Sequence, residues 1–484
     1  MPSVLIAVFD GLQPAQVNSV LMPNLASLAN EGVTFANHHP VFPTVTRANA
    51  SSMVTGRNPG GHGLAANTLV IREFDPNEAI PAMEPQLAQI ARQQIPVLLA
   101  PTLAEILSQH GHEYVAVGVG TSGNAYLHNP NAERCGGATI HPEFTLPNGL
   151  NEEIIGRFGP WPEEARPNTA RMAQAVRIMT EYVLPERNPA VSLIWSSEPD
   201  KSQHDAGVGS DLSNAAVTEA DAQFGRLLKW LEESGRFADT DVIVLSDHGY
   251  STIRETVNVR ELVAEAGYPS NGQAGGVVVA HNGGSVLFYA GNSDRETAQR
   301  LAAWLMEQPW CGTLTASSSV SDIEGTLPAA LVGNEGVRGP DLTMSFRWNS
   351  TPNDAGYLGY VYSTGGRPGQ GQHGSMSKYE LRNVMFARGP SFKQGLQVDA
   401  PSGNIDLAPT VLRILGIPAG KGMEGRVLEE AMVNGPDPAD VDWSREVHNT
   451  ERRLGDKVYR QQIAISRVGE TTYIDEGNST FGWR

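Results

Sequence analysis

The chain has 484 residues and a formal net charge of −18, from 35 Lys and Arg against 53 Asp and Glu. This acidic balance argues against a nucleic-acid polymer or an anionic membrane as the main partner, because both repel negative charge. The length exceeds what one hydrophobic core usually serves, so we expect two domains or one large domain with a substantial insertion.

The N-terminal segment and the two cysteines indicate the cellular compartment in which the protein is expected. Residues 1–10 contain no basic segment and run directly into an apolar strand, and no apolar run approaches the ~20 residues needed to span a bilayer. We expect a cytoplasmic protein without a membrane segment, or a periplasmic or secreted one if a native signal has been removed. Cys135 and Cys311 lie far apart, either paired or free, and form no CxxC metal motif.

The first half of the chain alternates predicted strands and helices. Residues 4–9 form a continuous apolar run that ends at Asp10, which is typical of a buried parallel strand. Further strands are predicted over 33–35, 114–118, 191–195 and 242–245. Helices are predicted over 22–31, 102–109, 169–182 and 213–233. This alternation predicts an α/β fold with a doubly wound, mostly parallel sheet flanked by helices.

The pattern changes between residues 253 and 370. Apolar segments at 277–280 and 286–289 flank an Asn-Gly-Gly sequence and predict a β-hairpin. A capping box at 293–296 predicts a helix that ends near Glu307. Further strands are predicted over 342–346 and 359–362. We expect residues 253–370 to form an inserted, smaller α+β cap that faces the substrate, while residues 1–252 and 371–484 form the catalytic core.

The core pattern resumes after His373. A strand is predicted over 384–387 and a helix over 405–415. Near the C-terminus, apolar residues at 463–465 and 471–474 predict a pair of strands.

Carboxylates and imidazoles follow several predicted strands. Asp10, Asp200 and the pair Asp247-His248 each come just after a strand, at the sheet edge where ligands bind in open α/β folds. His204 follows Asp200 by four residues, and His373 lies between Gly371 and Gly374 in a GQHG sequence. Each residue alone has an ordinary structural explanation, such as a turn or a helix cap. Together, six oxygen and nitrogen ligands suit one or two zinc ions.

The stretch from Phe42 to Asn67 places hydroxyls where a short helix is predicted to begin. The N-terminus of a helix attracts phosphate through its free N–H groups and its dipole. A hydroxyl is a poor nucleophile at neutral pH unless something activates it. Thr44 and Thr46 are both candidates, and the ordinary explanation for Thr44 is a capping hydroxyl.

Five motifs recur in the order of a known family. They are VFDG at 8–11, PTVTRAN at 43–49 with TG, HG and Asn67 following, EPDKSQH at 198–204, SDHG at 246–249 and QHGS at 372–375. The chain therefore resembles the alkaline phosphatase superfamily, most closely its nucleotide pyrophosphatase/phosphodiesterase (type I phosphodiesterase) family. The resemblance spans nearly the whole chain. It implies an alkaline-phosphatase-like core and zinc-dependent hydrolysis of phosphodiester or pyrophosphate bonds through a covalent phosphothreonine.

The resemblance also implies a role for individual residues. One of two zinc ions would be held by Asp200, His204 and His373, and the other by Asp10, Thr46, Asp247 and His248. Motif position favours Thr46 over Thr44 as the nucleophile. Asn67 falls where the family places an amide donor to a phosphoryl oxygen, and the backbone N–H of Arg47 would assist it.

The chain departs from the family after the nucleophile. The family commonly has an aromatic residue, Pro and Asn there, whereas Arg47, Ala48 and Asn49 follow here. Arg47 either binds a phosphoryl oxygen with its planar guanidinium or pairs with an acidic surface. Lys201, inside a ligand motif, raises the same question, although an exposed lysine is the ordinary interpretation. The alternatives are therefore a phosphomonoesterase or a phosphonoacetate-hydrolase-like enzyme, and, from another class, a non-catalytic metal- or nucleotide-binding protein.

The expected substrates are small phosphate esters, nucleotides or phosphonates, and the oligomeric state stays open. A sulfatase and a serine-dependent phosphoglycerate mutase are disfavoured, because Thr46 stands in the nucleophile position. His38 and His39 are expected in an exposed loop and His62 in a structural turn. Phe42, Trp195 and Tyr250 adjoin the motifs, and core packing is their default interpretation.

Overall fold

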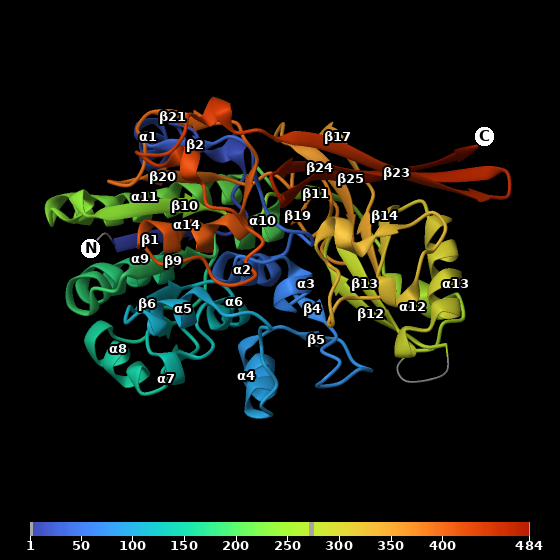
Figure 1. The fold of residues 1–484 in the computed structure, drawn as a ribbon, viewed down its shortest axis with the longest axis horizontal. Coiled ribbons are helices and arrows are strands. Elements are labelled where there is room, and N and C mark those ends of the chain that lie inside the picture. The colour runs from blue at the N-terminus through green and yellow to red at the C-terminus, as the bar shows by residue number, and fades with distance from the viewer. Residues whose placement is uncertain (1–2, 271–274, 484) are drawn as a thin grey trace.

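A nine-stranded sheet forms the centre of the computed structural model, which describes residues 3–270 and 275–483 (Figure 1). Its strands lie in the order β21-β2-β20-β10-β1-β9-β6-β7-β8. Their bounds are β1 (Ser3–Phe9), β2 (Val33–Phe35), β6 (Tyr114–Gly118), β7 (Ala138–Ile140), β8 (Thr145–Leu146), β9 (Val191–Ser196), β10 (Thr240–Leu245), β20 (Met385–Arg388) and β21 (Leu396–Val398). β1 pairs in parallel with β9 and β10, and β20 runs antiparallel to β10. The predicted doubly wound, mostly parallel sheet is confirmed.

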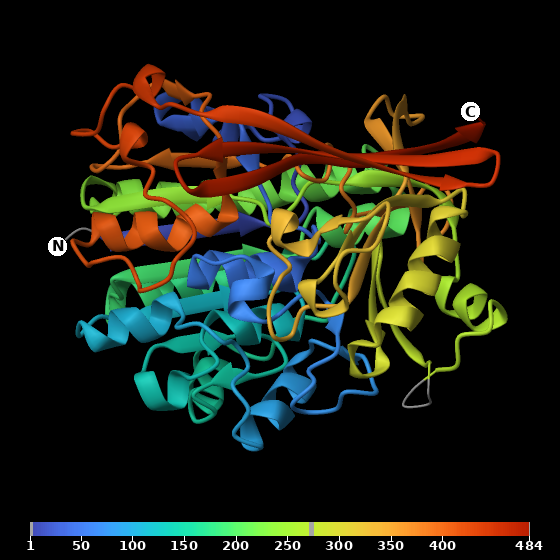
Figure 2. The ribbon, with the colours of Figure 1, turned by 45° about the vertical axis from the view of Figure 1, so that its right-hand side comes forward.

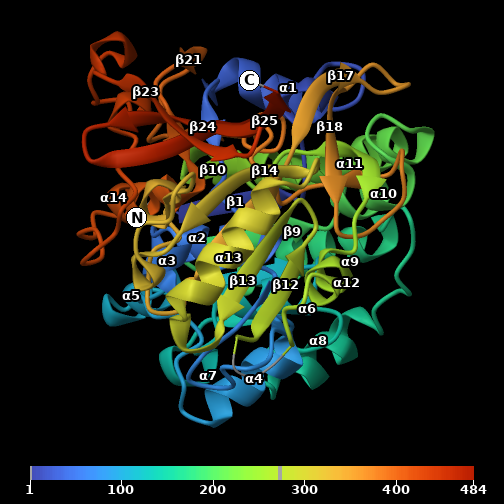
Figure 3. The same ribbon diagram turned by 90° about the vertical axis from the view of Figure 1, so that its right-hand side faces the viewer.

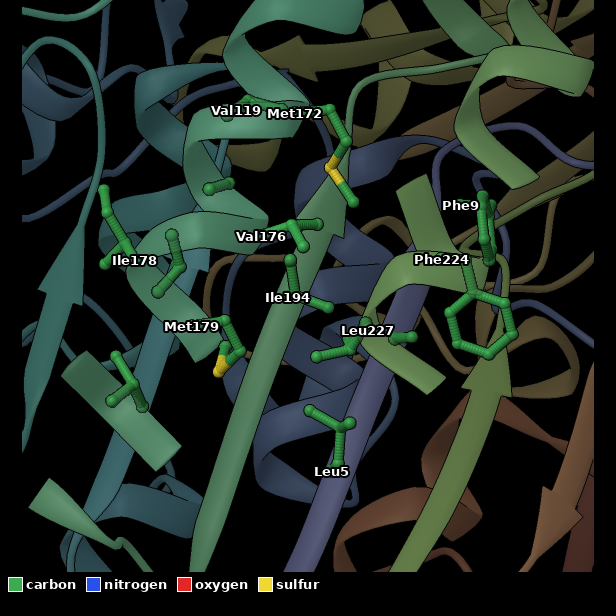
Figure 4. Packing of buried hydrophobic residues seen from close by; sticks show 14 of the residues in the cluster. Leu5, Phe9, Val119, Met172, Val176, Ile178, Met179, Ile194, Phe224 and Leu227 are labelled. Atoms are coloured by element: carbon green, nitrogen blue, oxygen red, sulfur yellow. The ribbon is translucent and has the colours of Figure 1, made fainter. Parts of the chain in front are cut away.

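Helices cover both faces of this sheet because the strands are apolar on both faces. The helices α1 (Pro23–Glu31), α8 (Leu150–Phe158), α9 (Thr169–Ile178) and α11 (Asp211–Glu233) pack on the face that carries Leu5 and Phe9. The helices α2 (Thr46–Thr55), α5 (Leu103–Gln109) and α14 (Leu407–Ile414) pack on the face that carries Val4 and Ile6. Figure 4 shows the first face, where Phe9 meets Phe224 edge to face at 5.7 Å between ring centroids.

Shorter elements complete the core. The helices are α3 (Pro59–His62), α4 (Glu84–Arg92), α6 (Ser122–His128), α7 (Ala132–Cys135) and α10 (Asp200–Ala206), and the strand pairs are β3 (His38–His39) with β22 (Ser402–Gly403) and β4 (Thr68–Leu69) with β5 (Ile80–Pro81). The helix predicted over 169–182 is α-helical only to Ile178 and continues as a π-helix over Met179–Arg187. Pro185 lies in this segment and disfavours regular α-helical hydrogen bonding.

Residues between 253 and 370 carry a sheet of their own. Its order is β12-β13-β16-β14-β15, with bounds β12 (Val277–Asn282), β13 (Ser285–Ala290), β16 (Leu342–Phe346), β14 (Cys311–Ala316) and β15 (Leu327–Pro328). The helices α12 (Val259–Glu265) and α13 (Arg295–Met306) accompany it, and α13 crosses the sheet in Figure 3. The cap of α13 differs from the prediction: Asp294, and not Ser293, accepts the hydrogen bond from the backbone N–H of Thr297 at 3.1 Å.

A four-stranded sheet adjoins this region. Its order is β17 (Trp348–Pro352), β18 (Leu358–Ser363), β11 (Ser251–Thr256) and β19 (Gly371–Gln372). β11 and β19 pair in antiparallel fashion, so the two ends of the segment between residues 253 and 370 lie side by side.

A long three-stranded ribbon ends the chain. Its strands are β23 (Ser444–Leu454), β24 (Lys457–Val468) and β25 (Thr471–Trp483), so it is longer than the predicted strand pair. The ribbon contacts the core, where Asp475 Oδ1 lies 3.1 Å from His39 Nε2. It also contacts the inserted region, where Trp348 Nε1 donates to the carbonyl of Gly477 at 2.7 Å. Figure 2 shows it crossing both parts.

Within the described parts of the chain, no helix combines the length and the apolar character required to cross a bilayer.

The start of α1 is capped from another helix. Met22 offers α1 no side-chain cap. Instead, the buried carboxylate of Asp221 on α11 accepts hydrogen bonds from the backbone N–H groups of Leu25 at 2.9 Å and Asn24 at 3.1 Å. Asp221 thus satisfies two of the free donors at the start of the helix and ties α1 to α11.

We expect Asp221→Ala to lower the free energy of unfolding by about 1–3 kcal/mol, because it leaves two N–H groups without partners. Urea denaturation followed by circular dichroism measures this change. Glu232→Ala on the exposed side of α11 is the matched control and should change the value by less than about 0.5 kcal/mol. Equal effects of the two substitutions would contradict the capping role.

Candidate functional site

The structure separates the two threonines that compete for the nucleophile role. Thr46 begins α2, and its Oγ1 lies 3.4 Å from Nε2 of His248. The hydroxyl of Thr44 is fully buried and engaged: it lies 3.0 Å from Glu380 Oε2 and accepts from the N–H of Gly374 at 2.8 Å. Thr44 is therefore a structural hydroxyl, while Thr46 lies against a predicted metal ligand.

Three predicted ligands converge beyond the ends of the adjacent strands β1 and β10. Asp10, Asp247 and His248 present ligand atoms that all lie within 4.8 Å of one another. Nε2 of His248 is 3.2 Å from Asp247 Oδ2 and 3.7 Å from Asp10 Oδ1. The other ring nitrogen, Nδ1, lies 3.0 Å from the carbonyl of Gly249. Donation to that carbonyl leaves the Nε2 lone pair directed at the carboxylates.

The other three predicted ligands form a second group. Asp200 and His204 lie on α10, which follows β9, and His373 follows β19. Asp200 Oδ1 is 3.4 Å from Nε2 of each histidine, and the two Nε2 atoms are 3.2 Å apart. Nδ1 of His373 contacts the carbonyl of Thr44 at 2.7 Å, so its Nε2 also carries the free lone pair.

The two groups lie side by side. The imidazole rings of His248 and His373, one from each group, stack with their centroids 3.7 Å apart. Thr46, beside His248, therefore lies at the junction of six potential ligands.

The donor chemistry of these groups fits metal ions. Asp10 Oδ1 and Asp247 Oδ2 are buried and make no hydrogen bond to any described residue. The Nε2 atoms of His204 and His373 lie 3.2 Å apart, close enough for both to bind one cation. Carboxylate and imidazole ligands of this kind are those that zinc prefers. The structure thus brings the side chains of each predicted ligand set together, while their role as metal ligands stays a prediction.

The charges within the two groups also favour the binding of cations. Burial raises the pKa of Asp10, and the neighbouring Asp247 and Asp200 raise it further. Burial also raises the pKa of Asp247. At Asp200 burial acts in the same direction, but His204 and His373 outweigh it and lower the pKa below its ordinary value. Three carboxylates this close are costly to ionise together without a compensating cation.

Two aromatic residues orient the carboxylates. Trp195 Nε1 donates to Asp10 Oδ2 at 3.0 Å, and the hydroxyl of Tyr250 donates to Asp200 Oδ1 at 2.8 Å. Both side chains are fully buried, as is Phe42, so none of the three presents a free face to a ligand. The expected core packing is present, and the hydrogen bonds to the ligands are an addition that sequence reasoning missed.

Glu380 is a further residue that sequence reasoning missed. Its buried carboxylate accepts from the hydroxyl and the backbone N–H of Ser375, each at 2.6 Å, and lies 3.0 Å from the Thr44 hydroxyl. It thereby joins the PTVT motif to the QHGS motif that carries His373. Glu380 lies outside both motifs, so no local pattern indicates it.

A hydrogen bond between Arg47 and Asn67 bears on the expected donors to the phosphoryl oxygens. The backbone N–H of Arg47 donates to Oδ1 of Asn67 at 2.9 Å and is therefore already engaged, contrary to its expected use as a donor to phosphoryl oxygen. The same bond directs the amide of Asn67, whose Nδ2 donates to no residue that the structure describes. Asn67 thus keeps the free donor that the expected role requires.

The side chain of Arg47 is half-buried. Its Nη2 lies 2.8 Å from the sulfur of Met83, and its Nε has no partner among residues 3–270 and 275–483. Burial lowers its pKa to about 10, against the opposing charges of Asp10 and Asp200. No ion pair with an acidic surface forms within these residues, so the guanidinium keeps its hydrogen-bonding capacity.

Several other expectations need correction or completion. His38 and His39 are buried rather than exposed, because β3 pairs with β22 and His39 contacts Asp475 of the ribbon. Lys201 is also not exposed: its ammonium lies 2.9 Å from Glu164. His62 is structural as expected and contacts the Ser52 hydroxyl at 3.0 Å.

The two cysteines form no disulfide. Cys311 is buried and Cys135 is half-buried, and both are free thiols. Of the two possibilities that the sequence left open, the structure shows the unpaired one.

The inserted region contacts the site through the turn between β12 and β13. The N–H of Gly284 donates to the carbonyl of His373 at 2.7 Å, and Asn282 Oδ1 accepts from the N–H of Thr68 at 2.8 Å. Gly374 makes this close approach possible: its φ is +113°, and a Cβ there would lie 2.2 Å from the carbonyl of Asn282. One turn thus holds the loop of His373 against the end of the stretch that carries Thr46.

Comparisons with known proteins agree with this arrangement. A family model described as type I phosphodiesterase / nucleotide pyrophosphatase matches residues 4–374. An ectonucleotide pyrophosphatase/phosphodiesterase of Caenorhabditis elegans is 22% identical over 420 residues, which are 86% of this chain and 47% of that protein. A bis(5'-adenosyl)-triphosphatase of Xenopus laevis is 25% identical over 252 residues, 51% of this chain and 47% of that protein. The chain spans about half the length of these curated relatives.

Solved structures show the same fold. Murine ectonucleotide pyrophosphatase/phosphodiesterase 5, as an inactive threonine-to-alanine variant in complex with AMP, has a TM-score of 0.61 at 17% identity. The similarity covers 87% of this chain and 96% of that one. The human counterpart gives a TM-score of 0.61 at 16% identity, over 86% and 96% of the two chains. Since the family model covers more than half of the sequence, the chain belongs to the type I phosphodiesterase / nucleotide pyrophosphatase family.

Proposed function

We propose that this protein hydrolyses phosphodiester or pyrophosphate bonds in small molecules such as nucleotides, with Thr46 as the nucleophile. The proposal depends above all on one observation, the position of Thr46 Oγ1 at 3.4 Å from His248 within six potential metal ligands. Family membership supports the class of reaction. A nucleotide substrate is supported by the complex of the mouse relative with AMP and by the frog relative, a bis(5'-adenosyl)-triphosphatase.

The metal ions of the proposal are two zinc ions. Asp200, His204 and His373 would hold one, and Asp10, Asp247 and His248, joined by Thr46, would hold the other. When bound, they would lower the pKa of the hydroxyl of the nucleophile and balance the negative charge that gathers around phosphorus.

The side chains have distinct roles in the proposed reaction. Thr46 is the first residue of α2, which fixes the position of its hydroxyl. In the proposed reaction, Oγ1 forms a bond to phosphorus while the bond to the leaving oxygen breaks on the opposite side. Asn67 donates from Nδ2 to an equatorial phosphoryl oxygen, since its Oδ1 is held by Arg47 N–H. Water then cleaves the phosphothreonine and restores the hydroxyl, releasing the second product.

We propose that residues 253–370 act as a cap over a core made of residues 1–252 and 371–484. The turn that holds the loop of His373 supports this division, because it places the inserted region directly beside the site. The ribbon at the C-terminus would then brace the cap against the core through Trp348 and His39.

Arg47 supports a second candidate function. A half-buried guanidinium with an unpartnered Nε, beside the nucleophile, matches the doubly charged end of a phosphomonoester or a phosphonate. A phosphomonoesterase or a phosphonoacetate-hydrolase-like activity is therefore the alternative to the diesterase. A non-catalytic metal- or nucleotide-binding protein is a further alternative. It differs from the two enzyme functions in that the metal-loaded wild type would hydrolyse none of these substrates.

Removing the nucleophile tests the mechanism. Thr46→Ala should lower kcat for bis-p-nitrophenyl phosphate at least about 10³-fold while the protein keeps its zinc, as measured by mass spectrometry of the metal. Thr55→Ala is the matched control, because it removes a hydroxyl at the other end of α2 that bonds only to Ser51. If the Thr46 variant hydrolysed the diester as fast as the control, Thr46 would not be the nucleophile.

A substrate panel distinguishes the two candidate functions. The panel compares kcat/KM for bis-p-nitrophenyl phosphate, p-nitrophenyl phosphate and phosphonoacetate, in the wild type and in Arg47→Gln. We expect the diester to be preferred, and Arg47→Gln to reduce turnover of the monoester by about tenfold or more with little effect on the diester. A wild-type preference for the monoester or for phosphonoacetate by orders of magnitude would establish the second candidate instead.

A further inference from the structure

A second cavity lies between the core and the C-terminal ribbon, at the side of the molecule where β2 ends and β20 begins. Its volume is about 350 Å³, and none of the six potential metal ligands lines it. On the core side, the walls come from the loop after β1, from Asn37 after β2 and from the loop before β20. On the ribbon side, they come from Trp443, which precedes β23, and from residues of all three strands. The volume falls within the range of small-molecule sites, ~300–1,000 Å³.

One part of the cavity wall is apolar and aromatic. Pro14 and Ala15 are exposed there, and Tyr379 and Trp443 line the same space. The side chain of Trp443 is 43% exposed, which is unusual for an indole that has apolar neighbours to pack against. This wall offers a flat ring an offset or edge-to-face contact.

Arg382 contributes a cation that the protein leaves without a partner. Its half-buried guanidinium lines the cavity, and no hydrogen bond or ion pair joins it to any residue that the structure describes. Arg445 in the same cavity is instead neutralised, at 3.1 Å by Asp475 and at 3.0 Å by Glu476. Burial lowers the pKa of the Arg382 side chain, and the charge of Asp475 partly opposes that effect. An unpaired guanidinium in such a place favours an anionic ligand.

Asn37 provides a second unpartnered polar group. Its side chain is only 9% exposed and lines the cavity, yet its Oδ1 has no hydrogen-bond partner in the described parts of the chain. Buried amides are normally satisfied, so this one indicates a ligand or water at the cavity.

We propose that this cavity binds a small aromatic carboxylate. The ring would lie against Trp443 and Tyr379, and the carboxylate would accept two hydrogen bonds from the planar guanidinium of Arg382. Asn37 would accept from a donor substituent on the ring. Lys378, Arg382 and Arg445 line the cavity against Asp475 and Glu476, a balance of one positive charge that suits a monoanionic carboxylate better than a dianionic phosphate monoester.

Calorimetric titration of 2-naphthoate into the full-length, metal-loaded protein tests this proposal. We expect the wild type to bind 2-naphthoate, and Arg382→Gln to weaken binding about tenfold or more. Neutral 2-naphthalenemethanol should bind more weakly than 2-naphthoate and should not distinguish the wild type from the variant. Arg295→Gln removes the same charge at an exposed position outside the cavity and should leave the affinity unchanged.

Trp443→Ala provides a second, independent variant at a partly exposed position. It should also weaken 2-naphthoate binding about tenfold, whether or not Arg382→Gln folds. Absence of 2-naphthoate binding to the wild type, equal affinity in both cavity variants and the wild type, or equal affinity of the neutral analogue would overturn the proposal. Diester hydrolysis should be unchanged in both variants, so failure of this proposal and failure of the proposed function are separable.

Discussion

Charge convergence at one edge of the central sheet is the constraint on which the rest of the site depends. Asp10, Asp200 and Asp247 are brought together by strands β1, β9 and β10, which are neighbours in the sheet. Burial of these carboxylates in so small a space raises the pKa of Asp10 and of Asp247, which makes their joint ionisation costly without a compensating cation. In the proposed function, cations between these groups would offset the repulsion, and the same cations would activate the hydroxyl of Thr46.

The surroundings of the site hold this unfavourable cluster in place. Backbone carbonyls fix the tautomers of His248 and His373, while Trp195 and Tyr250 fix the orientation of two carboxylates. Such contacts set both the direction and the basicity of metal ligands. The turn of the inserted region and the carboxylate of Glu380 add a second set of restraints, this time on the loop of His373. The geometry at Thr46 is therefore imposed from the sheet, from the inserted region and from the loop itself.

The central sheet and the convergence of the ligands at its edge could be predicted from the sequence. The run of apolar residues in β1 and the alternation of strands and helices determine the sheet, and ligands that follow strand ends must then share one edge. The burial of His38 and His39 could not be predicted, because it depends on β22 and on the ribbon, both more than 360 residues away along the chain. The strand β23 was missed because the half-buried face that it has from His448 onward carries mostly polar and charged side chains, so its sequence shows no apolar alternation. Contacts such as Trp195 with Asp10 join residues that no local pattern relates.

The central claim is that two cations occupy the two ligand groups beside Thr46, and anomalous diffraction tests it most directly. Crystals of the zinc-loaded protein measured on either side of the zinc absorption edge should show two anomalous peaks. One peak should lie among Asp200, His204 and His373, and the other among Asp10, Asp247 and His248, in contact with Thr46. An anomalous map without a peak at these residues, or with zinc only at other residues, would contradict the account.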